Sequence, residues 1–336
     1  MKKIFNWSIF SKYRNDLFGI SIISIIIFHF FYNYVFSGNK DPFLLPISNF
    51  VVDWMGSVGV EFFLFLSGMG LFFSMKKGTS LSGFFRKRFD RILSVYIPIC
   101  LTYWLLYDII LRNKKASTFF LDFFGISFWW KGNRTVWFIA FIIIMYLIFP
   151  LVYKVVSKRD GYPWLFLIMT VCYIVFQIIM SIYFPNYWKK TEIAWGRISI
   201  FLTGAILGNR IYNKQNFKVE DFLLFVPGII LKIMYYVNGA NLLLKLRFVT
   251  WFYSLSLMLA IICVLYLINS KRLSNFLSVV GGMSLELYLS HVVIQNILKY
   301  FGFRMWNIWE YSFAMGISVV ISILLNRAIT GKKLCK

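Results

Sequence analysis

The sequence predicts an all-α integral membrane protein, a single domain over residues 1–336 built as a bundle of about ten transmembrane helices. Of its residues 60% are hydrophobic and only 15% are charged, against ~25% charged residues in soluble domains. Apolar runs of ~20 residues, the length that crosses a bilayer as a helix, recur along the whole chain. The connections between these runs are too short to form separate soluble domains.

The expected spans follow one another through short loops. They lie near residues 17–36, 56–75, 92–111, 136–156, 163–184, 194–213, 221–238, 248–268, 283–300 and 311–328. The first run ends in bulky aromatic residues rather than a small-residue cleavage site, so we expect it to remain as a helix. Residues 116–130 are apolar but too few to cross the bilayer and include Asp122, which predicts an interfacial or re-entrant segment.

The net charge of +23 is explained by membrane topology. Lysine and arginine concentrate in cytoplasmic loops, and the segments on the N-terminal side of the predicted bundle hold most of the 36 in this chain. This predicts a multi-pass protein of the cell membrane, in contact with membrane lipids and with both termini in the cytoplasm. It also removes the reason to expect a nucleic-acid partner.

The chain has only two histidines, His29 and His291, and both lie inside apolar runs. An ionisable side chain inside a membrane helix is costly to keep, so it indicates a functional site. On a helix, Asn33 shares a face with His29 one turn further on. The alternative for each histidine is a hydrogen bond to a neighbouring helix without chemistry.

Other ionisable residues are predicted at a similar depth. Glu61 lies ~7 Å inside its span and His29 ~10 Å inside its own, at 1.5 Å per residue, and Arg197 falls in the same outer third. A carboxylate beside an imidazole fixes its tautomer, and a cation stabilises an oxyanion, so Glu61 and Arg197 are candidate catalytic groups with His29. A structural ion pair between Glu61 and Arg197 is the alternative. Lys232 is expected to extend its amine to the interface.

A basic cluster, FFRKRFDRIL, precedes the third span. Guanidinium groups match phosphate oxygens, so Arg86, Arg88 and Arg91 are candidates for binding a phosphate-bearing cytosolic ligand. An ordinary positive-inside anchor is the alternative. The four cysteines are widely spaced and form neither a disulfide framework nor a metal-binding pattern, so no metal is expected.

Several stretches, in order, resemble the acyltransferase-3 family of membrane acyltransferases. They are IIIFHF in the first span, VGVEFFLFLSG at 58–68, FFRKRFDRIL at 84–93, TVWFIAF, WGRISIFLTG at 195–204 and GGMSLELYLSH at 281–291. The resemblance implies transfer of an acyl group, usually acetyl from cytosolic acetyl-CoA, to a hydroxyl of an extracytoplasmic glycan or lipid-linked sugar.

By position, the resemblance makes His29 the catalytic histidine, Glu61 the acidic residue of the second motif and His291 the histidine of the late span. Arg88 and Arg91 match the basic third motif. One position departs from the pattern, because Phe18 stands where the family has an arginine eleven residues before the first histidine.

Two other functions stay open at this point. A transporter or flippase of lipid-linked sugars would also place charges inside a helical bundle, although paired broken helices in two halves are not evident. A catalytically silent family member is the second alternative, and Phe18 is the residue that favours it.

Overall fold

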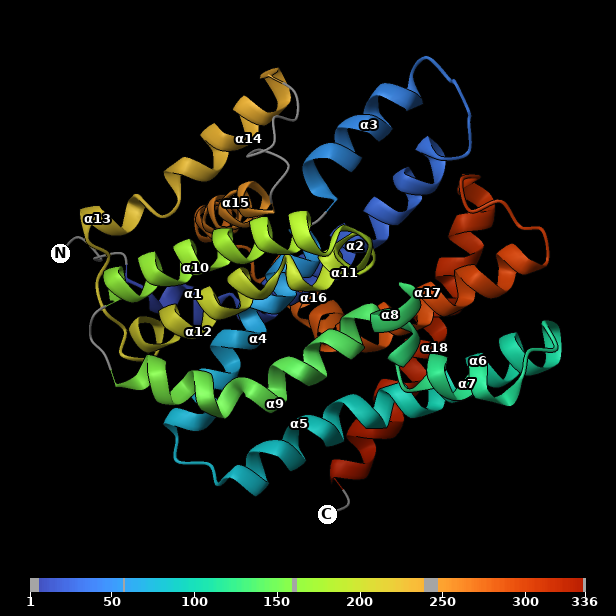
Figure 1. Cartoon of the computed structure of the whole chain (residues 1–336), viewed down its shortest axis with the longest axis horizontal. Coiled ribbons are helices and arrows are strands. Elements are labelled where there is room, and N and C mark those ends of the chain that lie inside the picture. Colours follow the sequence, from blue (N-terminus) through green and yellow to red (C-terminus); the bar gives the residue numbers. More distant parts are fainter. Residues whose placement is uncertain (1–5, 57, 159–161, 239–246, 335–336) are drawn as a thin grey trace. The chain divides into compact units, whose positions relative to one another are not determined.

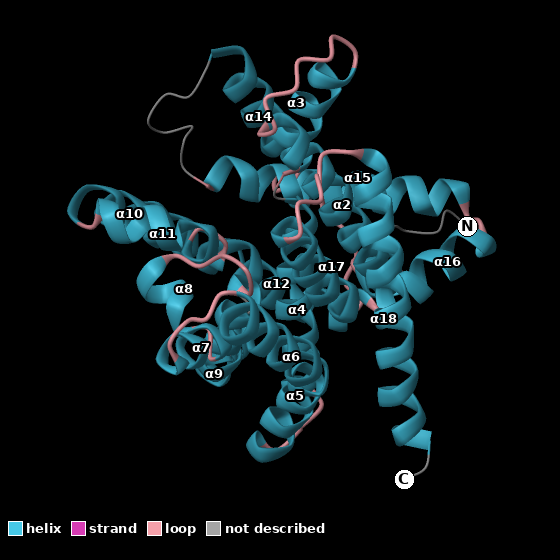
Figure 2. Cartoon of the chain, turned by 90° about the vertical axis from the view of Figure 1, so that its right-hand side faces the viewer, coloured by secondary structure: helices cyan, strands magenta, loops and turns pink. Residues whose placement is uncertain are grey.

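The computed structural model describes residues 6–56, 58–158, 162–238 and 247–334. These residues are helical almost throughout and contain no strand (Figure 2). A helix satisfies every interior backbone hydrogen bond within its own segment, which a hydrocarbon environment requires. The predicted all-α class is therefore confirmed.

The first half of the chain forms nine α-helices among the described residues, with two π-helical segments beside α6. They are α1 (Ser8–Lys12), α2 (Arg14–Val35), α3 (Leu44–Met55), α4 (Val58–Lys76), α5 (Leu81–Tyr96), η1 (Ile97–Leu101), α6 (Thr102–Trp104), η2 (Leu105–Leu111), α7 (Ala116–Phe123), α8 (Ile126–Lys131) and α9 (Trp137–Ser157). Pro98 near the start of η1 lacks the N–H that would continue the α-helical pattern, which accounts for a π-helical segment there.

The second half continues in the same way. Its helices are α10 (Tyr162–Tyr183), α11 (Pro185–Trp195), α12 (Ile198–Tyr212), α13 (Val219–Phe222), α14 (Val226–Asn238), α15 (Phe248–Ile268), α16 (Lys271–Gly282), α17 (Ser284–Tyr300) and α18 (Ile308–Leu334).

Seven helical segments in the described part of the chain are long and apolar enough to cross a membrane. They are Arg14–Val35, Leu44–Lys76, Leu81–Leu111, Trp137–Ser157, Pro163–Tyr183, Val249–Ile268 and Ile308–Gly331. The number rises to eight if the pair Lys271–Gly282 and Ser284–Tyr300, bent by 62°, forms one broken span. The chain is thus a multi-pass membrane protein.

The count of about ten spans is approximate because two of the expected spans are shorter helices. The run near 194–213 forms α12 with 15 residues, since Arg197 precedes its first turn. The run near 221–238 is divided into α13 and the 13-residue α14. At 1.5 Å per residue neither reaches the ~30 Å of a bilayer core.

The predicted interfacial or re-entrant segment consists of two short helices, α7 and α8. Gly125 separates them with a φ of +70°, a conformation that glycine adopts without a steric penalty. Neither helix is long enough to cross a bilayer alone, and the position of this segment at the interface stays a prediction.

The contacts of the chain define two compact units. The first comprises Met1–Phe18, Val60–Phe84 and Ile143–Ser278, and the second comprises Gly19–Gly59, Phe85–Ile142 and Val279–Lys336. Within the first unit α14 lies beside α15, and within the second α17 lies beside α18 (Figure 1).

Glycines bring α4 and α12 together in the first unit. A Cβ atom on Gly204 would collide with the backbone carbonyl of Phe65, and one on Gly68 would collide with the carbonyl of Phe201. The two backbones therefore approach as closely as small residues permit, which is how helices associate where no hydrophobic effect drives them. Gly204 therefore serves helix packing.

In the second unit, polar contacts attach α2 and α17 to α18. The Tyr311 hydroxyl donates to the Ile26 carbonyl at 2.5 Å. The Ser290 hydroxyl lies 3.2 Å from the Ser318 carbonyl and 3.0 Å from the Ser322 hydroxyl. These interhelical hydrogen bonds fix the rotation of α17, which carries one of the two histidines.

Candidate active site

Helices α2 and α17 bring the two histidines into contact within the second unit. The Nδ1 atom of His29 lies 3.2 Å from Nε2 of His291, and the ring centroids are 5.0 Å apart. His291 is fully buried and His29 is half-buried. The Nδ1 atom of His291 lies 2.8 Å from the Leu287 carbonyl oxygen.

These contacts define the tautomers of the two neutral rings. A carbonyl oxygen can only accept a hydrogen bond, so Nδ1 of His291 carries a proton and its Nε2 is the acceptor. His29 therefore donates from Nδ1 to His291, and Nε2 of His29 holds the basic lone pair. The pair presents one basic nitrogen whose ring is oriented by a second imidazole.

A row of polar side chains continues from the histidine pair along the same two helices. The Asn33 amide donates to Oε1 of Gln295 at 3.3 Å, and the Lys299 amine donates to Oδ1 of Asn33 at 2.8 Å. Gln295 and Lys299 follow His291 at intervals of four, so they share its face of α17. Sequence reasoning missed both residues, although this spacing was a readable signal.

The other two predicted catalytic residues belong to the first unit. Glu61 and Arg197 are both buried, with Nε of Arg197 3.9 Å from Oε1 of Glu61. Arg197 also donates from Nη1 to the Ile193 carbonyl at 2.5 Å, which holds the guanidinium at the start of α12. The structure thus forms the ion pair that the sequence analysis gave as the alternative, and the catalytic role of the two residues stays a prediction.

A second ion pair occurs in the first unit that sequence reasoning missed. Arg247 donates from Nε to Oε2 of Glu192 at 2.7 Å, and its Nη2 lies 2.6 Å from the same oxygen. Its backbone N–H donates to Oε1 of the buried Gln177 at 3.0 Å. No spacing in the sequence relates these three residues, which come from three different helical regions.

Lys232 is buried beside two aromatic rings. Its amine lies 5.0 Å from the centroid of the Tyr235 ring and 5.8 Å from that of Tyr253, and the residue is 9% exposed. Aromatic faces attract the cation there, and the expected extension of the amine to the interface stays a prediction.

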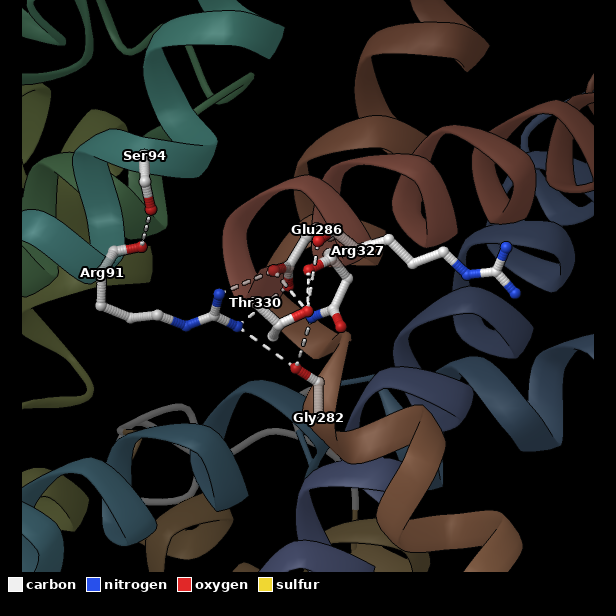
Figure 3. Close-up of polar contacts among 7 residues, drawn as sticks. Arg91, Ser94, Gly282, Glu286, Arg327 and Thr330 are labelled. Atoms are coloured by element: carbon white, nitrogen blue, oxygen red, sulfur yellow. Dashed lines mark hydrogen bonds and ion pairs between the residues drawn. The ribbon is translucent and has the colours of Figure 1, made fainter. Parts of the chain in front are cut away.

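The three arginines assigned to phosphate binding have different surroundings on α5. Arg86 is largely exposed and lies 3.8 Å from Asp90, one turn away. Arg88 is half-buried. Arg91 forms hydrogen bonds of 2.6 and 3.0 Å to the two oxygens of Glu286, whose side chain is fully buried (Figure 3).

Arg14 lies beside the residue that departs from the family pattern. Its Cζ atom is 4.9 Å from the centroid of the Phe18 ring, one turn further along α2. Gly70 faces the same guanidinium, and a Cβ atom there would approach Nη2 of Arg14 to 3.3 Å. The missing side chain of Gly70 thus leaves room for a cation at the level of Phe18.

The described residues include no group of three or more His, Cys, Asp or Glu side chains that could hold a metal ion. The fold and its sites define a multi-pass helical membrane protein that encloses a histidine pair and separate buried ion pairs. A family model described as an acyltransferase domain matches residues 19–327.

The chain therefore belongs to the acyltransferase-3 family, as the sequence motifs predicted. The matched residues include both histidines, Glu61, Arg197 and the basic cluster. No curated protein and no solved structure matches the chain.

Proposed function

We propose that the protein is a membrane O-acetyltransferase, which moves an acetyl group from cytosolic acetyl-CoA to a hydroxyl of an extracytoplasmic or lipid-linked glycan. The observation that carries the proposal is the histidine pair, because it presents a basic nitrogen of defined orientation inside a membrane acyltransferase fold. The family match runs through both compact units, which supports one acyltransferase domain over residues 1–336. We place it in the cell membrane with both termini in the cytoplasm.

In this scheme Nε2 of His29 accepts the proton of the acceptor hydroxyl while that oxygen attacks the thioester carbonyl carbon. The tetrahedral intermediate then loses the C–S bond, and the imidazolium returns the proton to the departing thiolate. The products are an acetyl ester and the free thiol of CoA. His291 accepts from Nδ1 of His29 throughout and so keeps the ring in place. A covalent variant, in which Nε2 itself attacks the thioester first, uses the same nitrogen.

The remaining predicted residues have supporting roles. Arg86 and Arg88 are proposed to bind the phosphates of the donor on the cytoplasmic side. Asn33 is proposed to act with the histidine pair, since its amide belongs to the polar row that continues from it. Glu61 and Arg197 are proposed as catalytic groups, with the structural ion pair as the alternative.

The first experiment measures acetyl transfer from radiolabelled acetyl-CoA in inverted membranes that contain the protein. We expect the label to enter a glycan fraction as an ester, so that mild alkali releases it as acetate, together with an equal amount of free CoA thiol. Membranes without the protein are the control. Label and thiol that stay at the control level would contradict the proposal.

We predict that Arg14 supplies the charge that the family arginine supplies at the position of Phe18. Its guanidinium already lies over the Phe18 ring in space left by Gly70. A charge-assisted hydrogen bond contributes about 1.5–3 kcal/mol. Arg14→Ala should therefore lower kcat/KM for acetyl-CoA by about tenfold to a hundredfold.

The rescue variant is Arg14→Ala combined with Phe18→Arg, which returns the cation one turn further along α2. It should recover most of the lost kcat/KM for acetyl-CoA, whereas Phe18→Leu alone should change it little. If Arg14→Ala retains full activity, the arginine does not replace the family residue.

A further inference from the structure

The break between α16 and α17 is held by side chains from two other helices. The two helices are bent by 62° around Met283. At the end of α16 the Gly282 carbonyl accepts hydrogen bonds from Nη2 of Arg91 at 3.3 Å and from the Asn326 amide at 3.4 Å (Figure 3). A carbonyl at a helix end has no partner within the helix. Side chains from α5 and α18 provide the missing hydrogen-bond donors at this break.

Glu286, the third residue of α17, is the centre of this contact. Its side chain is fully buried, and its two oxygens accept 2.6 and 3.0 Å hydrogen bonds from the two terminal nitrogens of Arg91. The Asn326 amide donates to Oε1 at 3.2 Å. This bidentate geometry is the strongest that a guanidinium forms with a carboxylate. A carboxylate near the start of a helix is also favoured by the helix dipole.

These contacts use the guanidinium atoms that a phosphate would need. Nη1 and Nη2 of Arg91 are both engaged by Glu286, and Nη2 also contacts the Gly282 carbonyl. A ligand phosphate could replace Glu286 only by leaving a fully buried carboxylate without its cation, which is strongly unfavourable. Arg86 differs, since it is largely exposed and its Nε atom lies 3.8 Å from Oδ2 of Asp90.

The same contacts fix the start of the helix that carries His291. Glu286 and Ser290 are one turn apart on α17, and Ser290 is hydrogen-bonded to α18. Leu287, next to Glu286, provides the carbonyl that sets the His291 tautomer. The first two turns of α17 are therefore bound on one face to α5 and α18, and the next residue along is the imidazole that orients His29.

We propose that Arg91 and Glu286 are positioning residues, which hold the start of α17 so that His291 meets His29, and that Arg91 does not bind the donor phosphates. The expected effect of Arg91 and Glu286 on acyl transfer rests on the proposed function. Their effect on the placement of the two imidazoles is independent of it, because that placement can be observed without turnover.

Solid-state NMR of the protein in liposomes, with 15N-labelled histidine, observes the two rings alone because the chain has only two histidines. We expect two neutral rings that are both protonated at Nδ1. Arg91→Gln and Glu286→Gln should each change this signature, because each removes the ion pair from one side. The double variant places two amides opposite each other, is neutral, and should restore the signature.

In the transferase assay the two single variants should lower kcat by about tenfold to a hundredfold, the cost of a small misplacement of a catalytic group. The KM for acetyl-CoA should stay within about twofold. Arg86→Gln, on the same helix but exposed, should leave the NMR signature unchanged. If a single variant does not fold while the double variant folds with the native signature, the positioning role of Arg91 and Glu286 is supported. An unchanged signature in Arg91→Gln or Glu286→Gln would overturn it, as would an increase in KM for acetyl-CoA confined to Arg91→Gln.

Discussion

His29→Gln should reduce acetyl transfer by about 10²–10⁴-fold, the usual contribution of a general base. Glutamine approximates the size of the imidazole and can still donate to Nε2 of His291, but its amide has no basic nitrogen. The helix contacts of α2 therefore stay in place while the proton acceptor is lost. The measurement is the initial rate of ester-linked label in the glycan fraction.

The partner histidine provides the comparison. His291→Phe removes the acceptor of the His29 Nδ1 proton, so the His29 ring is no longer held in the tautomer that is protonated at Nδ1. We expect this to lower kcat by at least about tenfold. His291→Gln retains an acceptor oxygen and should lower kcat less. Ile27→Val, on the exposed side of α2, is the control for expression and membrane insertion of a variant of this helix. A His29→Gln protein that inserts normally and transfers acetyl at the native rate would exclude His29 as the base.

Neutralising one member of the Glu61–Arg197 pair should destabilise the protein by about 3–5 kcal/mol, because the other charge stays buried without compensation. Both side chains are almost fully buried, so water cannot replace the missing partner. Thermal unfolding in detergent should show this for Glu61→Gln and for Arg197→Gln. The double variant should recover most of the loss, because no unpaired charge is left behind.

Activity of the double variant separates the two roles of this pair. If Glu61 and Arg197 are catalytic, the double variant is stable but transfers acetyl far more slowly than the native protein. If they are only a structural pair, stability and transfer recover together. For the unfolding measurement the matched control is Asp90→Asn, which removes the exposed partner of Arg86. We expect it to change the stability by only about 0–1 kcal/mol, the contribution of an exposed ion pair.

The tertiary structure changes the interpretation of particular residues more than that of the fold. His29 and His291 are 262 positions apart in the sequence, yet the two rings are in contact. Rise per residue gives the height of a side chain on its own helix but neither the tilt of that helix nor the neighbour it faces. The partner of Arg91 is equally unreadable from its own helix, because Glu286 lies 195 positions further along the chain.

The sequence by itself determined the helical membrane class, the family and the two histidines as candidates. These follow from local properties, namely the length of the apolar runs, the scarcity of charge and the cost of placing an ionisable group within such a run. Only the tertiary structure decided which side chains meet: His29 with His291, Arg91 with Glu286 and Arg247 with Glu192. It also showed that α12 and α14 are shorter than the expected spans at those positions. The physical reason is that helix rotation and helix breaks depend on contacts between distant segments, and no local periodicity specifies them.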